Sequence, residues 1–446
     1  MGGDAIKEKG ETYLPKPDPT NYTEENNARY KQYLIRALFY GITARTVNGM
    51  LGLVYSKPQP EFDLHANLEY IKTNIDGSGI TLTQQTKKVI HDVSALGRAG
   101  LLTDYSKSNS EVSQQDVIDG KVRAVIKRYN AENILWAETQ NKGVENILSL
   151  VILLESYVLP AGDGYTSKTD VQFRVLSLAD GIYGQEIYRK IDGKDEFEAI
   201  EAEGSIPVDN SGAYFDHIPF TFVGAVNNDH KFDNPPMLSI ADLNIAHYRN
   251  SADYEESCFV NGQPTYYFTG LTKSWIDDVL KGVVRIGSRG GVPLPEGAGA
   301  GILQADANTL PAEGMKTKET QMAAIGAQIV TGDSGTTTAT EINRNSTVED
   351  SVLVNIVSNV EQAYNFCFQQ VTLFTGIEIP EYGINKEFNY ESFDSSRYTS
   401  LINGAMQGLN TKEDAFNYLK RTGMVNYDVE FESWNNTIDN SIPGVM

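Results

Sequence analysis

The chain has few of the features that mark a secreted, membrane-bound or disulfide-linked protein. Its two cysteines, Cys258 and Cys367, both lie in segments with helical periodicity, which predicts reduced thiols in the core rather than a disulfide. No run approaches the ~18 apolar residues of a membrane span, and residues 1–20 lack the apolar stretch of a signal peptide. The composition therefore predicts a protein made in the cytoplasm with no membrane partner.

Metal-ligand and nucleotide-binding patterns are also missing. The five histidines form no HxxxH or HxH pair, and no cysteine pair stands near enough to complete a zinc site. His247 is expected to be a packing or interface residue. Gly297, Gly299 and Gly301 precede no strand–turn–helix unit, and GxxxxGK[ST] is absent. We expect no metal, no cofactor and no enzymatic activity.

Basic side chains are scarce. The chain has 37 Lys and Arg against 59 Asp and Glu, a formal net charge of -22. A general nucleic-acid-binding protein presents a basic face to the phosphates, so this balance argues against that class. It is compatible with a conduit, because strong attraction between the wall and DNA would slow the passage of the DNA.

What the chain does have is size and clear periodicity. Its 446 residues, 40% of them hydrophobic, are enough for two to four domains. Alternating prolines at positions 15, 17 and 19 predict an extended N-terminal arm over residues 1–20. Residues 21–55 and 82–96 have helical spacing, residues 99–105 read as a strand, and Asp76-Gly77-Ser78-Gly79 reads as a turn.

A strand-rich block follows from residue 121 to residue 219. The predicted strands, separated by turn signals such as Gly162-Asp163-Gly164, cover residues 122–129, 134–138, 148–159, 171–178, 184–190 and 197–201. The run 148–159 is long and mostly apolar, so a buried helix is its alternative. The block as a whole predicts an antiparallel meander, which makes the fold class α+β.

Long helices dominate the remainder. Helical spacing resumes after Pro235-Pro236 and ends near Gly262, and a Gly- and Pro-rich span with short strands then precedes a helix over residues 315–330. The hydroxyl-rich stretch TGDSGTTTAT, residues 331–340, separates that helix from a roughly ten-turn apolar stripe over residues 341–376. Residues 400–424 have helix–turn–helix character.

The tetrapeptide around Ser334, GDSG, matches the nucleophile motif of chymotrypsin-like proteases. That mechanism needs a histidine base and a buried aspartate, brought to the serine by a β-fold. Here the motif joins two helices, and no histidine stands in a matching context. A small, hydroxyl-rich loop with one charge is better suited to sliding contact with a polyanion, so a hydrolase using Ser334 is an unlikely alternative.

The order of several motifs resembles the portal proteins of tailed bacteriophages, in particular a compact subfamily of short-tailed and some long-tailed phages. The most specific stretch is Pro235-Pro236-Met237-Leu238, followed by residues 240–244 and HYRNSADYE, residues 247–255. The other matching segments are Arg29-Tyr30 with Tyr33, ARTVNGMLG (residues 44–52), DGSG (residues 76–79), GRAGLLTDY (residues 97–105) and TATE (residues 338–341).

This resemblance implies a portal fold. The implied regions are an N-terminal arm (1–20), a β-rich wing (21–236), a stem helix (237–262), a clip (263–310), a second stem helix (311–330), a tunnel loop (331–340), a long spine helix (341–379) and a helical crown (380–446). It further implies a ring, usually of twelve subunits, at one capsid vertex of the virion. Double-stranded DNA would pass through that ring during packaging and ejection.

The implied partners are other copies of the chain, the major capsid protein, scaffolding protein, terminase and a head–tail adaptor or tail protein. For DNA contact we expect the tunnel-loop residues Thr331, Ser334, Thr336, Thr337, Thr338 and Thr340, with Lys316, Lys318 and Arg344 as possible phosphate contacts. For partner binding at the clip we expect Trp275, Lys273, Lys281, Arg285 and Arg289.

Two alternatives stay open at this point. A ring-forming tail or adaptor protein that never encloses DNA fits the same absence of chemistry, and Trp275 could be a core residue of the clip rather than an exposed anchor. Each tunnel-loop hydroxyl could equally be solvated without touching DNA.

Overall fold

The chain folds into two compact units of mixed helix and strand, which confirms the α+β class. The computed structural model describes residues 2–105, 123–160, 166–191, 196–263, 265–281, 291–304, 308–331, 351–386, 388, 394–425 and 429–441. One unit comprises residues 1–45 and 239–326, and the other comprises residues 46–238 and 327–446. The range 21–236, predicted as one wing, is therefore divided, because residues 21–45 belong with the unit that contains residues 239–326.

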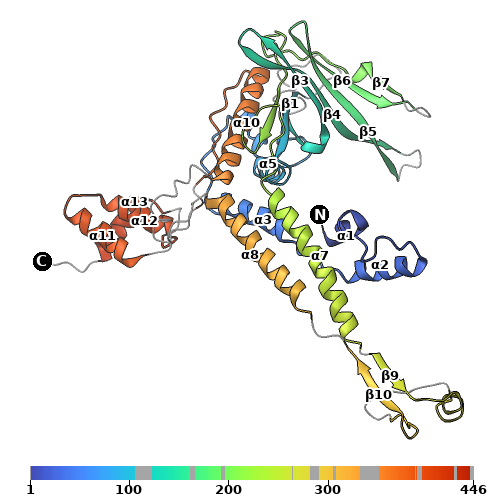
Figure 1. The fold of residues 1–446 in the computed structure, drawn as a ribbon. Coiled ribbons are helices and arrows are strands. Elements are labelled where there is room, and N and C mark those ends of the chain that lie inside the picture. Colours follow the sequence, from blue (N-terminus) through green and yellow to red (C-terminus); the bar gives the residue numbers. More distant parts are fainter. Residues whose placement is uncertain are drawn as a thin grey trace. The chain divides into compact units, whose positions relative to one another are not determined.

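The first unit is built on two long helices with a small sheet beyond one end of the pair (Figure 1). Helix α7 (Leu238–Asn261) is followed by strands β9 (Thr265–Thr269) and β10 (Gly299–Leu303), which pair antiparallel, and then by α8 (Leu310–Thr331). A single turn of π-helix, Trp275–Val279, lies between the two strands. The helix–sheet–helix order predicted for residues 237–330 is confirmed.

The N-terminal residues are not the extended arm that the prolines predicted. Helix α1 (Gly3–Glu8) and a 3₁₀ turn (Gly10–Thr12) precede the Pro-containing stretch. Ile6 and Leu14 are buried in one cluster with Tyr30 and with Tyr248 of α7. The three prolines constrain only their immediate neighbours, whereas burial of the two aliphatic side chains decides the conformation upstream.

The helical character predicted for residues 21–55 is confirmed, and the structure divides this range into two helices. Helix α2 (Glu24–Arg36) starts at the Thr23 cap, whose side chain accepts from the Asn26 N–H, and α3 (Ile42–Val54) follows after a break. Ala37 is extended, and the backbone N–H of Leu38 donates to Ser251 Oγ at 3.1 Å. A hydrogen bond to distant α7 thus replaces one within the helix.

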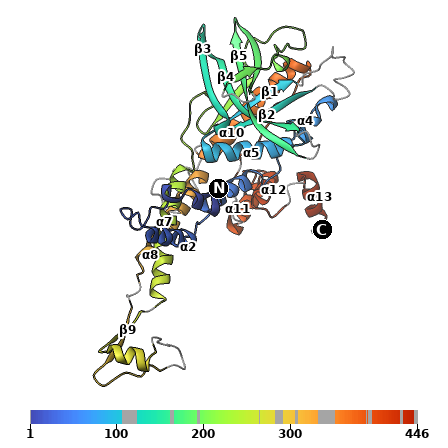
Figure 2. The same cartoon turned by 90° about the vertical axis from the view of Figure 1, so that its right-hand side faces the viewer.

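Two antiparallel sheets form the framework of the second unit (Figure 2). The smaller sheet has the order β2 (Ala124–Asn130), β1 (Arg98–Tyr105), β8 (Phe220–Gly224). The larger is a meander of β3 (Ile134–Lys142), β4 (Glu145–Pro160), β5 (Ser167–Ala179), β6 (Ile182–Lys190) and β7 (Phe197–Ala199). The strand reading of residues 148–159 is therefore confirmed, because β4 pairs with a strand on each side.

Helices and aromatic side chains complete the core of this unit. Helix α5 (Leu82–Leu96) has a Thr81–Gln84 capping box and ends at Gly97, and α10 (Val352–Thr375) starts at the Ser351 cap and ends at Gly376. The main cluster combines Leu153 and Leu176 of the large sheet, Phe222 of the small sheet and Phe374 of α10. Residues 341–350 of the predicted 341–376 helix lie outside the described residues.

The remaining described elements are short. They are the helix α4 (Tyr70–Thr73), the 3₁₀ turns Ala66–Leu68, Ala131–Asn133 and Glu201–Glu203, and the C-terminal helices α11 (Ser395–Met406), α12 (Lys412–Arg421) and α13 (Phe431–Ser441). Helices α11 and α12 confirm the predicted helix–turn–helix. The rings of Phe416, Phe431 and Trp434 pack together and join α12 to α13.

The two cysteines differ in their environments. Both are free, as predicted, and Cys367 is buried in α10. Cys258 is exposed near the end of α7, so the prediction that both are core thiols is wrong for this residue. Helical periodicity located it on a helix, but tertiary packing decides which face of that helix is covered.

Candidate functional site

The motif residues of α2 and α7 hold the first unit together. The hydroxyl of Tyr33 donates to Asp253 Oδ1 at 2.6 Å, and that of Tyr30 donates to the Leu14 carbonyl at 2.8 Å. Glu256 accepts from both Arg29 and Arg36, and the Arg36 guanidinium also lies 4.2 Å from the Phe259 ring centre. These residues therefore position helices and leave no free reactive group.

Helices α7 and α8 meet through polar contacts. His247 is buried, its Nε2 lies 3.1 Å from Glu319 Oε1, and the Tyr40 ring packs 5.3 Å from its centre. His247 is thus buried at a packing position, as the sequence predicted. At Gly314, a Cβ would lie 2.4 Å from Asn250 Nδ2, so a glycine lets the two helices approach at this level.

The small β-unit that joins α7 to α8 along the chain presents apolar side chains to solvent. Its exposed residues include Tyr266, Tyr267, Ile276, Val279, Ile302 and Leu303. The Tyr267 ring of β9 lies over Gly301, its partner on β10. A Cβ at Gly301 would come within 2.6 Å of that ring. An isolated two-stranded sheet with apolar residues on its surface is marginal alone, which makes this unit a candidate contact surface.

Trp275 has properties of both predicted alternatives. The side chain is half-buried, and its Nε1 donates to the Pro293 carbonyl at 3.3 Å. Lys273 and Lys281 are exposed on either side of it, and Lys281 adopts the left-handed conformation with φ 51°. Arg285 and Arg289 lie outside the described residues. The structure thus brings three of the five predicted clip residues into one small unit.

The predicted DNA-contact residues lie on α8 and after it in the chain. Lys316 is exposed and Lys318 half-buried on that helix, and Lys318 Nζ donates to the Gly314 carbonyl at 3.4 Å. Thr331 is the last residue of α8. Ser334, Thr336, Thr337, Thr338, Thr340 and Arg344 lie outside the described residues.

Two other sequence motifs prove to be turn and packing devices. In GRAGLLTDY, Gly97 has φ 76° and a Cβ there would lie 2.3 Å from the Asp233 carbonyl. The following Arg98 is 3% exposed between the rings of Phe222 and Phe232, and burial lowers the pKa of its guanidinium to about 10. In the predicted DGSG turn, Asp76 Oδ1 accepts from the Ser78 N–H at 2.9 Å, which confirms a turn.

An ion-pair network that the sequence did not reveal joins the two sheets of the second unit. Arg174 Nε donates to Glu155 Oε1 at 2.8 Å, and Arg174 Nη1 lies 3.5 Å from Asp104 Oδ2 of the small sheet. Burial alone would raise the pKa of Glu155, but the hydrogen bonds and charge of Arg174 outweigh it and lower that pKa to about 2. Strand alternation placed these residues on the sheet's inner face, but only the structure shows them paired.

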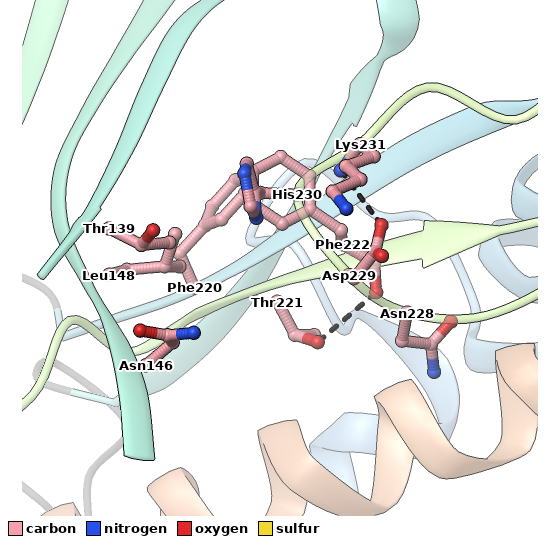
Figure 3. Close-up of a pocket in the computed structure, with 10 residues that line it drawn as sticks. All are labelled: Thr139, Asn146, Leu148, Phe220, Thr221, Phe222, Asn228, Asp229, His230 and Lys231. Carbon is pink, nitrogen blue, oxygen red and sulfur yellow. Dashed lines mark hydrogen bonds between the residues drawn. The ribbon is translucent and has the colours of Figure 1, made fainter. Parts of the chain in front are cut away.

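A pocket of about 320 Å³ opens between the two sheets (Figure 3). Thr139, Asn146 and Leu148 of the large sheet line one side, and Figure 3 shows residues 228–231 on the other. Asp229 Oδ1 accepts from the Lys231 N–H at 2.8 Å, and the Thr221 hydroxyl donates to the Phe222 carbonyl at 3.1 Å. The hydroxyls in the lining are those of Thr139 and Thr221.

The described residues contain neither a metal-binding cluster nor a membrane-spanning helix. In the described part of the chain, no group of three or more His, Cys, Asp and Glu is placed to hold a metal ion. Within those same ranges, no helix combines the length and apolar character needed to cross a bilayer.

A family model described as a domain of unknown function, DUF4055, matches residues 236–375, which is less than half of the chain. No curated protein matches. The residues that match the family model span α7, the β9–β10 unit, α8 and the whole of α10.

Solved structures of gene transfer agent (GTA) particles are similar at low identity. A chain of the virion of the native GTA particle is 10% identical with a TM-score of 0.40, and the match covers 88% of each chain. A chain of the neck of the empty particle, computed with C6 symmetry, is 12% identical with a TM-score of 0.41, covering 85% of this chain and 90% of that one. A chain of the neck of the native particle, computed with C12 symmetry, is 11% identical with a TM-score of 0.40, covering 82% and 84%. Similarity at this level does not assign the chain to any of these proteins.

Proposed function

We propose that this chain is a phage portal protein, a ring subunit that conducts double-stranded DNA at one capsid vertex. The observation that carries the proposal is the helix–sheet–helix arrangement of residues 238–331, in which α7 and α8 flank a small β-unit with exposed apolar residues. Together with the motif order described above, this arrangement supports α7 and α8 as stem helices and residues 263–310 as the clip. Residues 331–340 would then supply the tunnel loop, and residues 341–379, which include α10, the spine.

The dimensions of such a ring are consistent with a DNA channel. Twelve stem helices spaced at about 10 Å form a ring roughly 38 Å across its centre line, and subtracting one helix diameter of ~10 Å leaves a lumen of about 28 Å. A duplex passes through that opening with little clearance. With twelve subunits the formal charge is 12 × -22 = -264, so phosphates would be repelled from an acidic bore and DNA could slide.

The clip would dock the partners of the ring. Trp275 and the exposed apolar residues of β9 and β10 would contact the terminase during packaging and an adaptor afterwards, with Lys273, Lys281, Arg285 and Arg289 at the rim. Half-buried aromatic residues surrounded by charged ones are typical of such contact surfaces. The terminase would supply the energy for DNA movement.

The assembly itself provides the first test. Native mass spectrometry of the full chain should give a closed species near twelve times 49.2 kDa. Negative-stain class averages of the same sample should show a central hole wide enough for a duplex. A chain that stays monomeric even with scaffold and capsid protein present would overturn the proposal. A ring whose opening is too narrow for a duplex would favour the tail or adaptor alternative.

A second test addresses the loop. Replacing residues 331–340 with a short rigid turn should leave the ring assembled but reduce DNA packaging or retention, because the transient backbone contacts of the hydroxyls would be lost. The same turn placed at Gly143-Val144 serves as the control. Undiminished packaging by the 331–340 variant would contradict the tunnel-loop assignment. A Ser334→Ala variant assayed on peptide and ester substrates tests the hydrolase alternative, for which we expect no activity in either protein.

A further inference from the structure

The large sheet of the second unit has an apolar face on the side away from its core. Side chains alternate along a strand, and Val151, Leu153 and Leu176 point into the buried cluster. Their neighbours on β3, β4, β5 and β7 therefore point the other way. We define the outer face by six of its apolar residues: Trp136, Ile152, Leu154, Phe173, Val175 and Phe197.

The register places these residues side by side. Trp136 pairs with Ile152, Ile152 pairs with Val175, and Leu154 pairs with Phe173. The Phe173 and Phe197 rings are 4.7 Å apart. The outer face is thus one continuous apolar surface across the sheet rather than scattered single residues.

Among the described residues, this surface remains partly open to solvent. Trp136 is 56% exposed and Phe197 is 39% exposed, while the four central residues are half-buried, with their sheet neighbours beside them. Apolar sheet faces are normally buried against a helix or a second sheet. An open apolar surface of this kind marks an interaction site.

The charges on the outer face indicate which partner would cover it. Glu138 accepts from Trp136 Nε1 at 2.9 Å, and Glu186 accepts from the Tyr188 hydroxyl at 2.9 Å. Both carboxylates are exposed beside the apolar residues. Lys190 of β6, which pairs with Phe197 of β7, is a basic residue on the same face and already makes an interaction of its own.

We infer that the outer face is a docking site for an amphipathic helix of a different protein, one that carries basic side chains beside its apolar face. Aliphatic and aromatic side chains of that helix would cover Ile152 and Val175, and its Lys or Arg residues would pair with Glu138 and Glu186. A second copy of this chain is a poorer occupant, because its formal charge is -22. The inference stands independently of ring formation, which the outer face is not required to support.

The experiment titrates the full chain into a labelled synthetic helix with leucines on one face and lysines flanking them. A peptide of the same pattern with glutamates in place of lysines is its control. We expect anisotropy to report binding of the Leu/Lys peptide only, with a blue shift of Trp136 emission as its indole leaves water. Binding should weaken by about tenfold or more in the double variant I152S/V175S. The matched variant V144S, at a fully exposed turn residue off this face, should bind normally.

Charge reversal provides the second comparison. The variant E138K/E186K should lose the Leu/Lys peptide and gain the Leu/Glu peptide, whereas E25K/E381K, which makes the same net change elsewhere, should not. Urea unfolding of each variant identifies any that fail to fold. Equal binding by I152S/V175S and the parent chain would overturn the inference. Two other results would also overturn it. In the first, the parent chain does not bind the peptide but self-associates, and I152S/V175S loses that self-association. In the second, the parent chain binds neutral lipid vesicles and not the peptide.

Discussion

Replacing Arg174 with methionine should destabilise the second unit by about 3 kcal/mol at neutral pH. Arg174 forms charge-assisted hydrogen bonds to Glu155 and also donates to Gln185 Oε1 at 2.8 Å. Removing one partner of a buried pair leaves the other charge uncompensated, which costs about 3–5 kcal/mol. The lowered pKa of Glu155 gives a similar figure, because a fall from 4.5 to about 2 corresponds to roughly 3 kcal/mol.

The sign of the pH dependence follows from that lowered pKa. The folded pKa of Glu155 lies below its unfolded value, so its contribution is fully present above about pH 4.5 and is lost as the pH falls towards 2. The difference in unfolding free energy between the parent and Arg174→Met should therefore shrink from about 3 kcal/mol at pH 7 to near zero at the acid end.

Urea unfolding, followed by Trp136 fluorescence in a background lacking Trp275 and Trp434, measures this difference across the pH range. Arg189→Met is the matched control, since Arg189 pairs with the more exposed Glu203 and such pairs contribute at most about 1 kcal/mol. The reasoning is refuted if Arg174→Met is as mild as Arg189→Met. A difference that stays constant from pH 7 to pH 3 would also refute it.

Three further outcomes follow from particular contacts. Gly97→Ala should lower the unfolding free energy by about 1 kcal/mol or more in a thermal or urea melt, because φ is 76° at Gly97 and the Asp233 carbonyl leaves no room for a Cβ. Gly143→Ala is the control: Gly143 also has a positive φ but faces open space, so its replacement should lower the unfolding free energy by less. In the native chain, the exposed Cys258 should react with a thiol reagent at neutral pH, whereas Cys367 should not. Cys367 is buried, and burial raises the pKa of its thiol to about 12. Equal reaction of the two cysteines would contradict this prediction. His247→Phe should weaken the α7–α8 contact and increase amide exchange in α8, whereas Lys316→Ala on the exposed side should not.

Secondary structure was largely predictable because its determinants are local. The turn signals between the strands and the Pro-Pro entry to α7 are read within a few residues, and β4 and α7 formed where they indicated. Local pattern was insufficient where a distant residue supplied the decisive contact. Ser251 of α7 accepts a hydrogen bond at the break between α2 and α3, and Tyr248 buries the N-terminal Ile6 and Leu14.

The sequence by itself determined the class of the fold, the order of its elements and the absence of a recognisable catalytic motif, since all three depend on composition and short-range pattern. Only the tertiary structure decided which charged residues became buried partners and which apolar residues stayed open. Arg174 meets Asp104 across 70 residues of chain, and Trp136 remains exposed although its strand lies in a packed sheet. Both outcomes depend on how the two sheets stack, which brings together side chains that no local pattern relates.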